Sequence, residues 1–198
     1  AIFYPGDYFM VTREDALSLW HKYNKSESLY HHALAVEAVM REAAVKFNED
    51  PEYWGIVGLL HDVDWESFPD EHCKKASELL KEINAPDEMI HAICSHGWGI
   101  CVDIEPELYM EKVLFTIDEL TGLVTATALM RPEKMKGITV KSVKKKWNAH
   151  GFAAGVNREI IEKGAEMLNL ELPAVIQLTI DGMTKVAPEL GLWPEEDK

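Results

Sequence analysis

Hydrophobic residues recur at intervals of three and four positions along most of the chain. This spacing places them on one face of an α-helix, whereas few segments show the two-residue alternation of a β-strand. The pattern therefore predicts an all-α fold. We expect one helix to begin at Pro51 and the others to span residues 12–23, 28–47, 71–83, 86–96, 107–130, 140–148, 157–169 and 173–187.

The composition is that of a globular chain, with 47% hydrophobic and 27% charged residues. No run approaches the ~20 apolar residues that cross a bilayer, and residues 1–10 lack a basic start followed by an apolar run. We therefore expect no membrane partner and a cytoplasmic location. The three cysteines form no CxxC pair, which argues against a disulfide framework or a thiolate zinc site.

The charge balance is strongly acidic, with a formal net charge of −14. This balance argues against polymeric nucleic acid as a partner, because such binding depends on Lys and Arg. The basic cluster Lys144–Lys146 is typical of a solvated helix face. A small anionic substrate stays compatible with the chain, since bound metal ions can supply positive charge locally.

Several ionisable residues fall on helix faces that are otherwise apolar. His32 shares a face with Val36 and Met40, whereas its neighbour His31 points toward the solvent edge. The dipeptide His61-Asp62 follows a buried apolar run, so both side chains emerge from the core together. Taken alone, His32 is compatible with a hydrogen-bonded core histidine, and metal ligation is favoured only when these residues are taken together with those below.

A carboxylate and two further histidines extend this set. Asp118 lies in a helix that is apolar nearly all round, so we expect deep burial, which a carboxylate tolerates only with a cation, a metal or several donors. Periodicity turns His72 and His96 inward and leaves His91 in reserve. Imidazole with carboxylate suits Mn, Fe, Co, Ni or Zn. We therefore predict one or two divalent transition metal ions, held by His32, His61, Asp62, His72, His96 and Asp118.

The order His32, His61-Asp62, Asp118 resembles the H…HD…D signature of the HD-domain superfamily of metal-dependent phosphohydrolases. The segments HALAVEAVMR, GLLHDVD and LFTIDELTGL look like the ligand-bearing helices of that family. Two-metal members add two histidines, which His72 and His96 match. The resemblance implies a helical bundle with an N-terminal helical segment, an HD domain and a C-terminal helical extension packed on the same core, at residues 1–27, 28–130 and 131–198.

The resemblance also implies an activity. A metal-activated water would cleave a phosphomonoester or phosphodiester of a small nucleotide-like molecule, with Asp62 bridging two metals and Asp64 relaying protons. Trp65 stands where single-metal relatives often carry glutamate, and Asp64 and Glu66 flank it, so Glu66 is a second candidate for the acid that helps proton transfer. The GYP segment of cyclic-dinucleotide phosphodiesterases is absent from the sequence. Two alternatives stay open: a di-iron oxygenase that uses O₂, and a nucleotide-sensing domain without turnover. A homo-oligomer is also left open.

Overall fold

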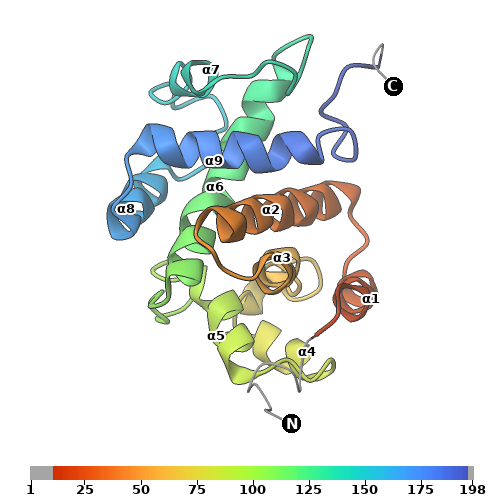
Figure 1. Cartoon of the computed structure of the whole chain (residues 1–198). Coiled ribbons are helices and arrows are strands. Elements are labelled where there is room, and N and C mark those ends of the chain that lie inside the picture. The colour runs from red at the N-terminus through yellow and green to blue at the C-terminus, as the bar shows by residue number, and fades with distance from the viewer. Residues whose placement is uncertain (1–10, 196–198) are drawn as a thin grey trace.

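The computed structural model describes residues 11–195, which form nine α-helices and one short 3₁₀ helix and contain no strand (Figure 1). The predicted all-α fold is confirmed. The helices are α1 (Arg13–Tyr23), α2 (Glu27–Lys46), α3 (Pro51–Leu60), η1 (Pro69–Glu71), α4 (Ala76–Lys81), α5 (Asp87–Ser95), α6 (Tyr109–Leu129), α7 (Val140–Lys144), α8 (Arg158–Leu168) and α9 (Leu172–Lys185).

The long helices α2 and α6 organise the packing. Helix α2 lies between α3 and α9 (Figure 1). Helix α6 crosses α2 and also packs against α8. Residues of α2, α3, α6, α8 and α9 join one hydrophobic core. The C-terminal helices therefore pack on the same core as the helices that hold the predicted ligands, while the sequence boundaries at 27/28 and 130/131 stay predictions.

Local signals in the sequence explain where most helices begin. The side chains of Thr12, Ser26, Asp50 and Asn157 each accept a hydrogen bond from a backbone N–H in the first turn of α1, α2, α3 and α8. Such caps satisfy donors that a helix start leaves without an intrahelical partner. Asn169 ends α8 in the left-handed conformation, which asparagine tolerates well.

The predicted continuous helix over residues 71–83 is wrong. Cys73 has a φ of 67°, a left-handed conformation that cannot continue a right-handed helix, so α4 begins only at Ala76. The carboxylate of Asp64 accepts a hydrogen bond from the backbone N–H of Ala76 at 2.9 Å. His72 thus lies on a connecting segment, and its inward direction is set by that segment rather than by helical periodicity.

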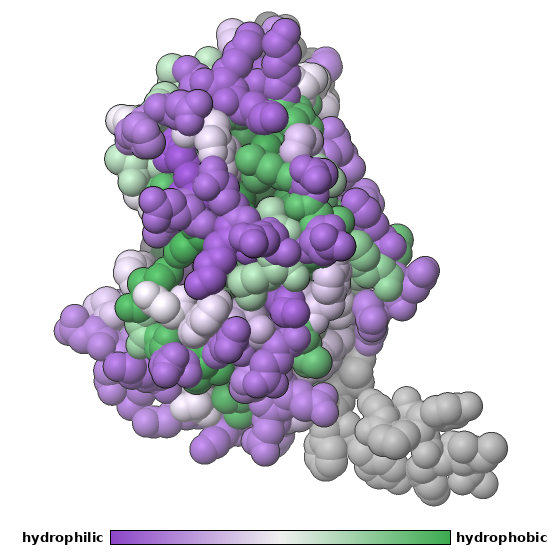
Figure 2. All heavy atoms as spheres, turned by 90° about the vertical axis from the view of Figure 1, so that its left-hand side faces the viewer, coloured by the Kyte–Doolittle hydropathy of each residue, from purple (hydrophilic) through white to green (hydrophobic). Residues whose placement is uncertain are grey.

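The surface agrees with a chain rich in charged residues. Figure 2 shows the side that is on the left in Figure 1, where hydrophilic side chains dominate and hydrophobic ones form smaller patches among them. Within residues 11–195, none of the helices combines the length and the apolar character that a membrane crossing requires.

Candidate metal centre

Two groups of ligand atoms meet where α2, α3, α6 and the turn after α5 come together. The first group contains His32, His61, Asp62 and Asp118, with one atom from each within 4.8 Å of the others. Nε2 of His32 lies 3.1 Å from Nε2 of His61 and 2.9 Å from Oδ1 of Asp118. Atoms that each bind the same ion at about 2.1 Å are separated from one another by distances similar to the 2.9 and 3.1 Å found here. The four side chains therefore fit a single cation.

The second group lies on the other side of Asp62. Nε2 of His72 and Nε2 of His96 are 3.2 Å apart. Oδ1 of Asp62 lies 3.4 Å from the first of these nitrogens and 3.2 Å from the second. The three atoms form a compact triangle of the size that ligands of one transition metal ion adopt.

The carboxylate of Asp62 faces both groups, with one oxygen toward each. Its Oδ2 lies 3.4 Å from Nε2 of His32 and 3.2 Å from Nε2 of His61, whereas Oδ1 faces His72 and His96. This orientation is the one that a bridging carboxylate adopts between two ions.

The other ring nitrogen of each histidine faces a second polar partner. Nδ1 of His61 donates to the carbonyl of Gly58 at 2.7 Å, and Nδ1 of His96 donates to the carbonyl of Ile93 at 2.6 Å. Nδ1 of His72 lies 2.7 Å from Oδ1 of Asp64. Such contacts select the tautomer that leaves Nε2 free as a ligand.

His32 follows the same pattern more loosely. Its Nδ1 lies 3.5 Å from Oγ1 of Thr121, whose hydroxyl donates to the backbone carbonyl of Asp118 at 2.7 Å. Four imidazoles therefore point Nε2 toward two acidic side chains and Nδ1 away from them. A set of buried histidines that serve only structural roles has no reason to share this orientation, so the donor set fits metal ions.

Asp64 has a different place from the one that a proton relay needs. Its side chain is fully buried, and its two oxygens face Nδ1 of His72 and the backbone N–H of Ala76. It therefore orients His72 and caps α4, and the prediction that it carries protons finds no support in this placement. No feature of the sequence alone identified this orienting role.

The centre is open on one side. The side chain of His61 is fully buried, but Asp62 and Asp118 keep 18% and 20% of their side-chain surfaces exposed. The predicted deep burial of Asp118 is therefore wrong, since a fifth of its surface reaches solvent. This exposure gives a small molecule a route to the ligand atoms.

Other candidate residues lie outside the two groups. Nδ1 of His91 pairs with the carboxylate of Glu111, which also accepts backbone N–H groups at the start of α6. The carboxylate of Glu66 accepts the backbone N–H groups of Lys25 and Ser26 near the start of α2. Trp65 is half exposed and packs edge-on against the ring of His72.

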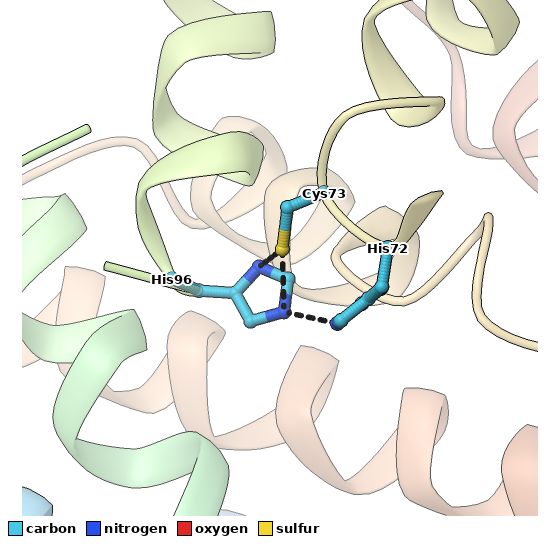
Figure 3. A group of neighbouring side chains, drawn as sticks. All are labelled: His72, Cys73 and His96. Atoms are coloured by element: carbon cyan, nitrogen blue, oxygen red, sulfur yellow. Dashed lines mark hydrogen bonds between the residues drawn. The ribbon is translucent and has the colours of Figure 1, made fainter. Parts of the chain in front are cut away.

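Cys73 lies beside the second group, and its Sγ, with one nitrogen each of His72 and His96, is close enough to share one ion (Figure 3). Its Sγ lies 3.7 Å from Nε2 and 3.9 Å from Nδ1 of His96. Because these distances are nearly equal, the sulfur lies beside the ring and not beyond Nε2, where an ion would bind. The thiol therefore packs against the imidazole.

We predict that Cys73→Ser retains the metal content of the wild-type protein. The change removes a soft ligand but leaves His72, His96 and Asp62 in place. Metal content per chain, measured after loading both proteins with Zn²⁺ and removing excess ion, checks this. Loss of one ion per chain in the variant would show that the sulfur rotates to bind the second cation.

In the metal-free centre, the protonated imidazoles and the carboxylates stabilise each other's charges. Burial disfavours a proton on His32, but its hydrogen bonds with Asp118 and Asp62 outweigh burial and raise its pKa to about 9. Burial also opposes protonation of His61, yet the charges of Asp62 and Asp118 hold its pKa well above the usual range. The paired imidazoles keep the pKa values of both carboxylates low despite their burial. Protons thus neutralise the acidic side chains when no cation does.

We expect metal affinity to fall as the pH falls below about 9, because the cation must displace the proton of His32. Each displaced proton lowers the affinity about tenfold per pH unit. The stability of the metal-free fold depends on pH in the opposite direction. The raised pKa of His32 contributes stability that is complete below pH 6.5 and is lost as the pH rises through about 9.

Calorimetric titration with Mn²⁺ in buffers of different ionisation heat checks this expectation. At pH 7 at least about one proton should be released per chain on loading. An affinity that stays constant from pH 6 to pH 9 would contradict the assignment of His32 as a ligand.

Comparison with known families agrees with this geometry. Residues 29–100 match the family model of the HD domain, a segment that contains His32, His61, Asp62, His72 and His96. This segment is therefore similar to an HD domain, and the predicted resemblance to that superfamily is confirmed. Proteins with this domain are typically metal-dependent phosphohydrolases, and some are not catalytic. No solved structure gave a significant match to the chain.

Proposed function

We propose that this protein is a metal-dependent phosphohydrolase that cleaves a phosphoester of a small, nucleotide-like molecule in the cytoplasm. The observation that carries the proposal is the shared orientation of four histidines, whose Nε2 atoms face the two oxygens of Asp62 and Oδ1 of Asp118. Two adjacent cation positions around one carboxylate suit displacement at phosphorus.

In this proposal the ligands divide between two cations. His32, His61 and Asp118 would hold the first and His72 and His96 would hold the second, while Asp62 presents one oxygen to each group. Asp64 orients His72 through its Nδ1 and touches no reacting atom. Bound divalent ions supply an activated water and a positive charge that offsets the charge of a phosphate.

The protein residues perform the remaining tasks. The hydrogen bonds at Nδ1 of His61 and of His96 hold these two imidazoles with Nε2 toward the cation positions, so little reorganisation accompanies binding of a phosphate. The apolar side chains behind the ligands limit water at the centre and strengthen electrostatic interactions there. The partial exposure of Asp62 and Asp118 lets the phosphate approach from one side.

Metal stoichiometry tests the ligand set first. The protein is purified without chelator, loaded with Mn²⁺ or Fe²⁺, and measured by elemental analysis. We expect close to two ions per chain. One ion would restrict the centre to His32, His61, Asp62 and Asp118, and none would mean that the histidines are structural.

Hydrolysis is then tested with phosphomonoesters, dinucleotides and bis(p-nitrophenyl) phosphate in the presence of Mn²⁺. Release of alcohol and phosphate in equal amounts supports a monoesterase. Oxygen consumption that only iron sustains would favour the di-iron oxygenase, and tight nucleotide binding without turnover across several metals would favour a sensor. Either of these results would overturn the proposed hydrolysis.

A further inference from the structure

A cavity adjoins the first group of ligands. It has a volume of about 460 Å³, and the side chain of His32 forms part of its wall. Pockets that bind small organic ligands have volumes of roughly 300 to 1,000 Å³. A group attached to a phosphate at the metal centre would therefore reach this cavity by passing His32.

The walls of the cavity are largely apolar. Ala35 comes from α2, Ala126 and Leu129 come from α6, and Leu192 comes from the segment that follows α9. Small side chains at two of these positions leave room for a ring between the helices. A ring that entered would exchange contact with water for contact with carbon atoms, which stabilises the bound state.

The polar groups on the walls are few and carry no fixed charge. Ser28, His31 and Thr125 are among the residues that line the cavity, and none of its described lining residues is Lys, Arg, Asp or Glu. His31 keeps a third of its side chain exposed and lies 3.8 Å from the carboxylate of Glu27. Nothing on these walls would compensate the charge of a second phosphate, whose desolvation would be costly.

We propose that this cavity binds the organic group of the substrate and selects a phosphomonoester of an uncharged, largely apolar ring-sized group. The inference rests on the proposed phosphohydrolase function and narrows it. The negative charge of the substrate is then confined to the one phosphate at the metal centre, and the hydroxyl groups of Ser28 and Thr125 orient polar atoms on the ring. Nucleoside triphosphates are excluded by the same argument.

The C-terminal extension contributes to this selection. Leu190 and Leu192 are buried, and the carbonyl of Leu192 accepts a hydrogen bond from the backbone N–H of Met135 at 3.0 Å. This bond anchors the segment after α9 to the segment after α6. One wall of the cavity therefore comes from residues outside the part of the chain that matches the HD domain.

The test compares turnover with binding. The Mn²⁺-loaded protein is assayed with methyl, phenyl and 1-naphthyl phosphate and with ATP, and calorimetry measures the binding of methylphosphonate and 1-naphthylphosphonate. We expect kcat/KM and affinity to rise at least about tenfold from the methyl to the naphthyl compound. Ala126→Leu, which fills the cavity, should remove most of that ratio, whereas Ala154→Leu on an exposed loop should leave it unchanged.

The outcomes separate the two proposals. Three results would overturn the cavity assignment and leave the proposed hydrolase activity intact. Turnover could be independent of the organic group, or it could favour ATP. The naphthyl-to-methyl ratio of kcat/KM could also stay the same in an Ala126→Leu protein whose Tm is unchanged. Absence of turnover, combined with tighter naphthylphosphonate binding that Ala126→Leu weakens, would overturn the hydrolase and support the cavity as the ligand site. Equal binding of both phosphonates would contradict the cavity assignment whether or not turnover occurs.

Discussion

Replacing Asp62 with alanine is expected to abolish turnover and to leave at most one ion per chain. The carboxylate of Asp62 faces both sets of histidines, with Oδ2 toward His32 and His61 and Oδ1 toward His72 and His96. Loss of a residue that only orients a ligand typically lowers metal affinity or activity by 10- to 100-fold. Loss of the shared ligand should therefore lower kcat/KM by more than about 100-fold.

Asp70→Ala provides the matched control, because this aspartate is exposed on η1. Both variants lose one carboxylate, but only Asp62→Ala should change the metal content measured by elemental analysis. Circular dichroism establishes that each variant is folded before activity is compared. Full activity in Asp62→Ala would refute the dinuclear assignment.

The second large effect concerns the crossing of α2 and α9. A Cβ atom added to Gly182 would lie 2.6 Å from the Cα atom of Val39 and 3.0 Å from the carbonyl oxygen of Ala38. These are backbone atoms, so no side-chain rotation can relieve the contact and the two helices must separate. We expect Gly182→Ala to destabilise the fold by about 2–3 kcal/mol and to lower Tm by about 5–10 °C.

The destabilisation expected for Gly182→Ala is opposite in sign to the effect that helix propensity alone would give. Alanine normally stabilises an exposed helix interior by up to about 1 kcal/mol relative to glycine. Gly151→Ala serves as the control, since a Cβ there meets nothing within 4 Å. The Tm values of the two variants, measured by thermal unfolding, test this expectation. A Gly182→Ala protein as stable as the wild type would show that α2 and α9 accommodate the added Cβ atom without loss of stability. Separation of the helices would also shift Leu192 and the cavity beside His32.

Helix periodicity predicted much of the site, because it depends on local geometry that a sequence displays. His32 on the apolar stripe of α2 points toward the carboxylates of Asp62 and Asp118, and His96 at the end of α5 points toward that of Asp62. Periodicity succeeded for these residues because each is held by a helix whose buried face is evident from its apolar neighbours.

Periodicity failed where the backbone leaves the helical region. The chain around Cys73 adopts a positive φ, so the direction of His72 depends on Asp64 and on the start of α4 rather than on a helical face. The same limit explains Asp118. The sequence shows that its helix is apolar, but the packing of α2 against that helix and the approach of His61 decide how much of the carboxylate reaches solvent.

Local patterns in the sequence predict the helical class and most helix starts, because periodicity and caps act over a few residues, and together with the family resemblance they predict the six proposed ligands. The folded chain shows which oxygen of Asp62 faces which group of imidazoles, that Asp64 orients His72, and that Leu190 and Leu192 wall a cavity beside His32. These arrangements depend on contacts between segments far apart in the chain. Their geometry is set by how whole helices pack, which no local pattern specifies.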